Sequence, residues 1–271
     1  MRRNSDKKYN DFIDLMLNAG KDKDSTRDDT GAHVAFHAIG DEGNNSLVSG
    51  KPNIKNLTNT PLTEDEMVAQ GLVFIVAGYE GPTNTLAFCT YELAVNPSAQ
   101  SRLYEEIVAS QDSDGEVDGD ALARLPFMDA VVAETLRLHP PSVKLWRSAS
   151  EDYALGDTGI TIRKGQKLEL SVYGIHRSEE YYANADTFIP DRFLPENRHT
   201  IQPYTYLPFG AGPRNCIGMR FALMEVKLAL FHIIKKYELV RVPQTQVPLK
   251  STKFKRANST TSVVIGVKYR I

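Results

Sequence analysis

The spacing of apolar residues divides the chain into two unequal parts. Residues 7–19 place their apolar side chains on one side of a predicted helix, and these side chains are Phe12, Ile13, Leu15, Met16 and Leu17. Residues 20–59 are rich in Asp, Gly, Asn, Lys and Ser, which is typical of a mobile surface loop or a disordered insert. We therefore expect residues 1–59 to form a short helix plus a flexible insert, and residues 60–271 to form the folded part.

A long helix is predicted at the start of the folded part. Thr63 and Glu66 have the Thr-x-x-Glu spacing of a capping box, in which each side chain bonds the backbone of the other residue. The apolar pattern then continues to about Val95. Asn96-Pro97 ends this helix and caps the next one, because proline suits the first helical position. The second helix is expected to fade in the acidic loop from 111 to 120.

Another helix and a β region are predicted further along. The helix covers about 126–138 and is stopped by His139-Pro140-Pro141. Two short strand-like runs, 160–162 and 167–170, flank Arg163-Lys164-Gly165-Gln166 and predict a β-hairpin.

The last third of the chain completes the predicted fold class. A helix of about 20 residues is expected from Ile217. Residues 240–242 and 263–265 have the composition of terminal strands. Helices followed by short strands in this proportion predict a mostly helical α+β fold.

Composition narrows the classes of function. The formal net charge of -2 gives no reason to expect a nucleic-acid partner. Cys89 and Cys216 are the only cysteines, which excludes a disulfide framework and argues against a cysteine-rich zinc site. His33 and His37 could present a metal pair on a helix, although so polar a segment favours a solvated loop. The longest apolar run, Gly71 to Gly78, is far shorter than the roughly 20 residues that cross a bilayer.

The main chemical signal lies in the ten residues from Phe209 to Gly218. They set the thiol of Cys216 among glycines, a proline and an arginine, directly before an apolar helical pattern. The thiolate is the metal-binding form of cysteine, and backbone N–H groups or a helix N-terminus stabilise it. A lone cysteine that binds the iron of a haem needs such a setting. Gly212 and Gly218 have no side chains, so the backbone can approach the flat haem ring closely. Arg214 offers a cation for a haem propionate, and Phe209 offers an aromatic shield for the sulfur.

This segment resembles the cysteine loop of the cytochrome P450 family. The family pattern, Phe-x-x-Gly-x-Arg-x-Cys-x-Gly, is matched at every fixed position by Phe209, Gly212, Arg214, Cys216 and Gly218. The resemblance implies haem, an iron protoporphyrin, as cofactor and Cys216 as its thiolate ligand. Thiolate ligation favours O–O cleavage. The alternative is a buried, inert cysteine in a glycine-rich turn.

The resemblance covers nearly the whole chain but corresponds to the C-terminal half of a typical family member. Residues 60–271 would then be the haem-binding C-terminal part of a P450 domain, without the N-terminal half of the family fold. The membrane anchor of microsomal members belongs to that half, so contact with a membrane is expected only through an anchor absent from this chain.

A second family motif concerns Glu134 and Arg137, which lie three residues apart on one side of a predicted helix. Alone, such a pair is often a solvated ion pair worth a few tenths of a kcal/mol. The resemblance adds Arg192, from a Pro-x-Arg-Phe segment, and implies a triad that holds the chain so that Cys216 is placed correctly. Arg147, after the Pro-Pro break, is implied to reach a haem propionate, or else is an ordinary strand-end arginine.

The long helix departs from the family pattern Ala-Gly-x-Asp/Glu-Thr. Glu80 matches the acid, and the resemblance implies a catalytic role for it in a proton path. Gly81 stands where the family usually has threonine, and Thr83 is not expected to replace it, because two residues rotate the helix by about 200°. Pro82 has no N–H for the Gly78 carbonyl, so the helix should bend or widen there. The departure indicates altered chemistry at this part of the helix, and the alternative is a kink without catalytic meaning.

The sequence around these motifs narrows the resemblance to an animal microsomal group that contains 3A-type enzymes and thromboxane synthase. The segments concerned are Pro203–Gly210, Met219–Met224 and Thr245–Leu249. The resemblance implies a monooxygenase that inserts one oxygen atom from O2 into a lipophilic small molecule, such as a steroid, fatty acid or xenobiotic. Thromboxane synthase lacks the usual threonine too and rearranges an endoperoxide without O2 or a reductase. An isomerase, or a truncated non-catalytic fragment that cannot hold haem, therefore stays open.

The resemblance also implies surroundings for the protein. NADPH–cytochrome P450 reductase would donate electrons, and the endoplasmic reticulum membrane would hold the full-length parent. Lys235 and Lys236 could form a basic contact surface for the reductase, or be plain solvated lysines.

Overall fold

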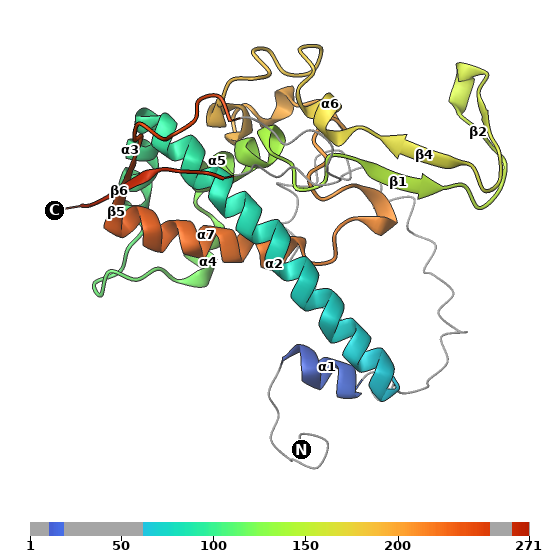
Figure 1. Ribbon diagram of the computed structural model, residues 1–271, viewed down its shortest axis with the longest axis horizontal. Coiled ribbons are helices and arrows are strands. Elements are labelled where there is room, and N and C mark those ends of the chain that lie inside the picture. Colours follow the sequence, from blue (N-terminus) through green and yellow to red (C-terminus); the bar gives the residue numbers. More distant parts are fainter. Residues whose placement is uncertain (1–10, 19–61, 250–261, 271) are drawn as a thin grey trace.

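The computed structural model describes residues 11–18, 62–249 and 262–270 of the chain, so the predicted insert with His33 and His37 lies outside the described residues. Within the described residues, helices dominate and the strands form small two-stranded sheets, which confirms the mostly helical α+β fold (Figure 1). The helices of more than one turn are α1 (Phe12–Asn18), α2 (Glu64–Val95), α3 (Pro97–Ala109), α4 (Gly119–Ala123), α5 (Pro126–Leu138), α6 (Val172–His176) and α7 (Met219–Lys236). The short helices α4 and α6 had not been expected.

The boundaries of α2 lie where the predicted capping signals placed them. The Thr63 hydroxyl accepts from the Glu66 N–H, and the Glu66 carboxylate accepts from the Thr63 N–H at 2.8 Å, so the capping box is confirmed. As the Asn-Pro step predicted, Asn96 follows α2 and is the N-cap residue of α3, with Pro97 at the first helical position, although the Asn96 side chain makes no capping bond to α3. Asn96 Nδ2 instead donates back to the Glu92 carbonyl oxygen at 2.9 Å. The Asn96 amide thus bonds the last turn of α2, and Pro97 begins α3.

The predicted hairpin over 160–170 is wrong in its pairing. β4 (Lys167–Leu170) pairs with β1 (Leu145–Ser148), and β3 (Thr161–Ile162) pairs with β2 (Tyr153–Ala154), both antiparallel. The turn between β3 and β4 exists, with Gly165 at a φ of +78°, but the strands that it joins belong to different sheets. Local alternation identified the strands, whereas their partners depend on residues distant in the sequence.

The terminal sheet is shifted from its predicted position. β5 (Tyr237–Val240) pairs with β6 (Gly266–Tyr269), rather than 240–242 with 263–265. The β-branched run before Gly266 favoured a strand by composition. Cross-strand partners begin only at Gly266, where an added Cβ would lie 2.6 Å from Val242 Cγ1. The strand therefore begins at a residue without a side chain.

α5 lies at the centre of the core. From Phe127 to Leu138 nearly every residue of α5 is buried, and the helix packs against α2, α3, α7 and the 3₁₀ turn Pro190–Phe193. A helix with this surround has no solvent-facing side. Glu134 and Arg137 on α5 are consequently inside the core and need partners there.

The two halves of α2 differ in burial. All of its buried residues lie between Pro82 and Ala94. The N-terminal half projects from the body of the molecule with α1 beside it (Figure 1), and the rings of Phe12 and Phe74 lie 4.2 Å apart there. Its exposed large apolar side chains include Val68, Leu72, Val73, Ile75, Val76 and Tyr79. Across the described ranges, no helix combines the length and the apolar character that crossing a bilayer requires.

Candidate functional site

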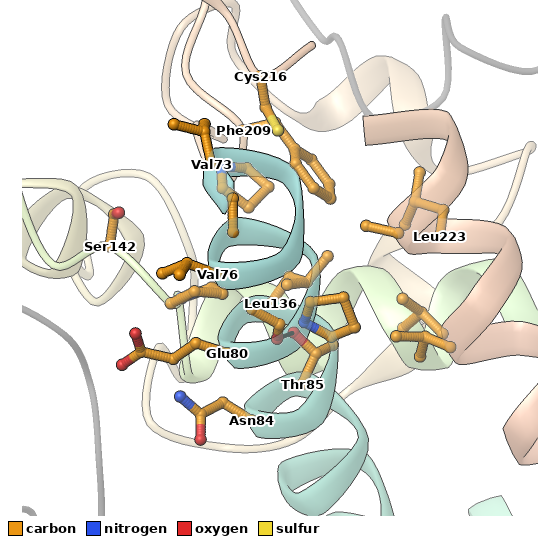
Figure 2. Close-up of a pocket in the computed structure, with 18 of the residues that line it drawn as sticks. Val73, Val76, Glu80, Asn84, Thr85, Leu136, Ser142, Phe209, Cys216 and Leu223 are labelled. Atoms are coloured by element: carbon orange, nitrogen blue, oxygen red, sulfur yellow. Dashed lines mark hydrogen bonds between the residues drawn. The ribbon is translucent and has the colours of Figure 1, made fainter. Parts of the chain in front are cut away.

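An apolar cavity lies between α2, α5, α7 and the loop that carries Cys216. Its volume of about 730 Å³ is within the range of roughly 300–1,000 Å³ that small-molecule sites occupy. Figure 2 shows α2 running along the cavity and Cys216 at one end of it. The labelled lining residues are Val73, Val76, Glu80, Asn84, Thr85, Leu136, Ser142, Phe209, Cys216 and Leu223. Hydrocarbon walls with a few polar groups suit a lipophilic ligand.

The loop that carries the thiol is closed by its own backbone. The Cys216 N–H donates to the Phe209 carbonyl at 2.9 Å, and the Asn215 N–H donates to the Gly212 carbonyl at 3.0 Å. Gly210 and Gly212 have φ values of +72° and +76°, which residues with side chains rarely adopt. Gly212 is thus needed for the loop conformation itself. Figure 2 shows the Phe209 ring beside the sulfur.

The two cysteines lie in opposite environments. Cys89 is fully buried in α2, and burial raises the pKa of its thiol to about 12, so it is protonated at neutral pH. Cys216 is exposed and lines the cavity. A buried, inert role fits Cys89 and does not fit Cys216.

The space beside the thiol fits a flat group that carries carboxylates. A Cβ added at Gly212 or at Gly218 would meet no atom within 4 Å. Arg214 lines the same cavity and is exposed, and no described carboxylate forms an ion pair with it. Its guanidinium is available to a carboxylate of a ligand. A single thiol also suits a metal that a macrocycle already holds.

Arg147, the second candidate cation, is not brought to this cavity. It lies on β1 opposite Leu168 of β4, it is exposed, and its Nη1 donates to the Trp146 carbonyl at 2.9 Å. The residues that line the cavity do not include it. Its predicted contact with a propionate stays a prediction.

The part of α2 that departs from the family pattern faces the cavity. Glu80 and Gly81 line it, whereas Thr83 is exposed and lies outside the lining, as the helical rotation predicted. A Cβ at Gly81 would meet nothing within 4 Å, so a larger side chain fits there. α2 remains helical on both sides of Pro82. The predicted bend at Pro82 stays a prediction.

Thr85 is a cavity residue that reasoning from the sequence missed. It lies one turn after Gly81, is buried, and lines the cavity. Its hydroxyl donates to the Gly81 carbonyl at 2.9 Å. Counting four residues on from Gly81 along the same side of the helix would have found it.

The predicted network of Glu134, Arg137 and Arg192 is confirmed. Arg137 Nε and Nη2 donate to the two carboxylate oxygens of Glu134 at 2.7 and 2.8 Å, and both side chains are fully buried. Arg192 Nε lies 3.4 Å from Glu134 Oε1, which also accepts from the Ile189 N–H at 2.9 Å. The bidentate pair therefore holds the chain around Pro190 against α5.

Arg137 also fastens the chain that leads toward the cysteine loop. Its Nη1 donates to the carbonyl oxygens of His176 and Ala185, both at 2.7 Å, and its Nη2 donates to that of Thr187 at 3.2 Å. Five donors in a fixed fork allow one guanidinium to make all these bonds. No pattern in the sequence specified which carbonyls these would be.

Comparison with known proteins agrees with this geometry. The model of the cytochrome P450 family matches residues 1–265, so the chain belongs to the cytochrome P450 family. Membership of this family implies a haem cofactor held by a cysteine thiolate.

The curated relatives come from more than one branch of the family. The chain is 44% identical over 191 residues to cytochrome P450 3A29 of Sus scrofa and equally to thromboxane-A synthase of Macaca fascicularis, matching 70% of this chain and 38% and 36% of theirs. It is 40% identical over 207 residues to cytochrome P450 9e2 of Blattella germanica, matching 76% of this chain and 39% of that one. The matched segments thus cover less than half the length of these relatives.

Proposed function

We propose that the residues of this chain form the thiolate side of a haem monooxygenase, which inserts one oxygen atom from O2 into a lipophilic small molecule. The observation that carries the proposal is the exposed thiol of Cys216 at the wall of a largely apolar cavity, in a loop that matches the family pattern. The apolar lining supports a steroid, a fatty acid or a xenobiotic as the class of substrate. Residues 60–271 would be the haem-binding part of the chain.

The residues of the cysteine loop have distinct roles in this proposal. The Cys216 sulfur is the metal ligand, and the Phe209 ring limits access of water to it. Gly212 and Gly218 leave room for the face of the cofactor, and Arg214 pairs with a propionate. When bound, the thiolate-ligated haem supplies the oxidising chemistry, because the sulfur favours O–O cleavage.

Glu80 is the proposed catalytic residue on the opposite wall. Its carboxylate lines the cavity and is also exposed to solvent, so its oxygens can take a proton from outside water and deliver it inward. Gly81 offers no hydroxyl beside it. The buried hydroxyl of Thr85 lies one turn away and donates to the Gly81 carbonyl.

A haem-thiolate isomerase acting on a peroxide is the second candidate function. Gly81 favours it, because the threonine that the family's monooxygenases usually carry at this position is missing. The equal identity to a 3A-type P450 and to a thromboxane-A synthase supports both candidates alike. A third possibility, from a different class, is a non-catalytic chain that cannot retain haem.

The proposed surroundings follow from the relatives. NADPH–cytochrome P450 reductase would be the electron donor, and the endoplasmic reticulum membrane would be the location. Lys235 and Lys236 give this little support, since Lys235 lies 3.8 Å from Glu116 and Lys236 lies over the Tyr237 ring. Both lysines are thus engaged within the chain.

The decisive experiment is the absorption spectrum of the full chain loaded with haem, reduced and bound to CO. A thiolate-type spectrum that Cys216→Ala abolishes and Cys89→Ala retains is the expected result, because only Cys216 reaches the cavity. An imidazole-type spectrum, or full retention in Cys216→Ala, contradicts the ligand assignment. Failure of the wild-type chain to take up haem supports the non-catalytic alternative.

Cofactor requirements separate the two catalytic candidates. Product formation from a lipophilic substrate only with O2, NADPH and reductase supports the monooxygenase. Turnover of a lipid endoperoxide without these three components supports the isomerase. Each outcome counts against the other candidate as the sole activity.

A further inference from the structure

His176 is a buried titratable residue that the roles above do not use. It ends α6, and its side chain is fully buried. The ring lies between the end of α5, at Arg137, and the chain that enters the cysteine loop, at Leu207. Leu207 comes directly before Pro208 and Phe209, which both line the cavity.

Both ring nitrogens are bonded, and their partners define the tautomer. Nδ1 lies 3.1 Å from the Arg137 carbonyl oxygen, which can only accept, so Nδ1 carries the hydrogen. The Leu207 N–H donates to Nε2 at 2.7 Å, so Nε2 carries none. The ring is therefore neutral. Burial and the nearby Arg137 and Arg177 charges act in the same direction and lower the pKa of His176 to about 3.

The two bonds join the helix of the Glu134–Arg137 pair to the cysteine loop. The contact is reciprocal, because Arg137 Nη1 donates to the His176 carbonyl while the His176 ring donates to the Arg137 carbonyl. A planar ring that is hydrogen-bonded at both nitrogens fixes the position of Leu207 relative to α5. Residues next to a metal ligand commonly orient it through hydrogen bonds of this kind.

Two tyrosines anchor the same stretch of chain. The Tyr206 hydroxyl donates to the Ala133 carbonyl at 3.2 Å, and its ring stacks on His176 with centroids 5.6 Å apart. The Tyr182 hydroxyl donates to the Thr205 carbonyl at 3.1 Å. Of these contacts, that of His176 with Leu207 lies nearest to the cysteine loop in the chain.

We propose that His176 is the positioning residue of the cysteine loop: its neutral ring bridges the Arg137 carbonyl and the Leu207 N–H, and so sets how Phe209 and Cys216 face the cavity. This inference rests on the proposed function only where the haem spectrum is the measurement. The hydrogen-bonded link itself is testable without haem.

Two substitutions separate the two bonds. In His176→Asn, the amide nitrogen takes the place of Nδ1 and can donate to the Arg137 carbonyl, but no acceptor reaches Leu207. In His176→Gln, the amide oxygen reaches the place of Nε2 and can accept from Leu207. His139→Asn is the matched control, because His139 is also a buried histidine at the end of α5 but bonds Glu92, with Nε2 2.7 Å from Oε1.

The first measurement is amide hydrogen exchange at Leu207 in the full chain without haem. After correction for global stability, exchange is expected to be about tenfold faster in His176→Asn, the change that losing one hydrogen bond produces, and near the wild-type rate in His176→Gln. His139→Asn is expected to leave the corrected rate unchanged. An unchanged corrected rate in His176→Asn overturns the proposal.

The second measurement is the ratio of thiolate-type to thiol-type spectrum in the haem-loaded, reduced and CO-bound chain. We expect a roughly tenfold lower ratio in His176→Asn, in line with the 10–100-fold losses that follow removal of groups behind a metal ligand. His176→Gln should restore the ratio, and His139→Asn should keep it. Equal ratios in His176→Asn and His139→Asn would mean a purely structural role and overturn the proposal. If the wild-type chain takes up no haem, the proposed function fails and the exchange result alone decides the role of His176.

Discussion

Two regions depart from the usual pattern of burial in opposite directions. One is the support of the cysteine loop, by which we mean Glu134, Arg137 and His176, and the other is the N-terminal half of α2. In the support, Glu134, Arg137 and His176 are ionisable side chains with no exposed surface. In the half helix, Ile75 and Tyr79 are large apolar side chains that remain 71% and 73% exposed. The first arrangement is stable because each of these polar groups has hydrogen-bond partners inside the core. In these two regions, the partners available to a side chain, rather than its polarity, therefore decide whether it is buried.

The largest expected effect comes from removing one charge inside the support. Glu134→Gln should lower the free energy of unfolding by about 3–5 kcal/mol, because the buried Arg137 guanidinium loses its counter-charge. Chemical denaturation of the chain measures this loss. Asp191→Asn is the control, since Asp191 pairs with Arg102 at 2.6 Å but both side chains are about half exposed, and it should cost less than about 1 kcal/mol. Equal losses in the two variants would contradict the contrast.

A second pair of substitutions compares the two halves of α2 directly. Leu93→Ala should lower the free energy of unfolding by about 2–5 kcal/mol, because Leu93 is fully buried and its truncation leaves a cavity. Ile75→Ala on the exposed half should change it by less than about 0.5 kcal/mol. Denaturant titration of both variants gives the comparison. A large loss in Ile75→Ala would mean that the exposed half is covered in solution.

The same contrast explains how much of the fold the sequence predicts. The limits of α2 and α5 follow from local signals, since a capping box, an Asn-Pro step and a Pro-Pro break each act within a few residues. The partners of β3 and β4 do not, because pairing depends on strands that the local pattern cannot identify. A helix pattern also does not report whether its apolar side is covered, as the exposed half of α2 illustrates.

The candidate site divides in the same way. Cys216, Arg214 and Glu80 were found from motif spacing, and the structure brings all three to one cavity. His176 was missed because an isolated histidine has no distinctive spacing, and Thr85 was missed although it lies four residues after Gly81 on the same side of the helix. Their importance depends on atoms that are far away in the chain or one turn away.

The support should also respond to pH through the buried ring of His176. The pKa of His176 is lowered from 6.5 to about 3 in the folded chain, so the unfolded chain binds more protons between these values. Stability from the neutral ring is complete above the unfolded pKa and is lost as pH falls toward the folded one. Between about pH 7.5 and pH 5 we expect a loss of about 2 kcal/mol from this residue.

Comparison with a variant isolates that contribution. Carboxylates titrate in both proteins, so the difference between wild type and His176→Asn in unfolding free energy against pH reports His176 alone. Arg137 and Arg177 are the cations that oppose protonation of the ring. A difference that stays constant from about pH 7.5 to pH 5 would show that the ring is not neutral and buried as described.

The smallest expected change in stability concerns the boundary between the two halves of α2. Gly81→Thr should stabilise the helix by a few tenths of a kcal/mol, because threonine has the higher helix propensity and nothing lies within 4 Å of the added Cβ. If the monooxygenase proposal holds, the added hydroxyl on the cavity wall should raise the fraction of NADPH electrons recovered as product. Gly78→Thr is the matched control, since it adds the same side chain to α2, also without an atom within 4 Å, but outside the cavity lining. A similar stability gain in both variants with improved electron recovery only in Gly81→Thr would assign the effect to the cavity. Unchanged recovery in Gly81→Thr would mean that position 81 does not limit the reaction.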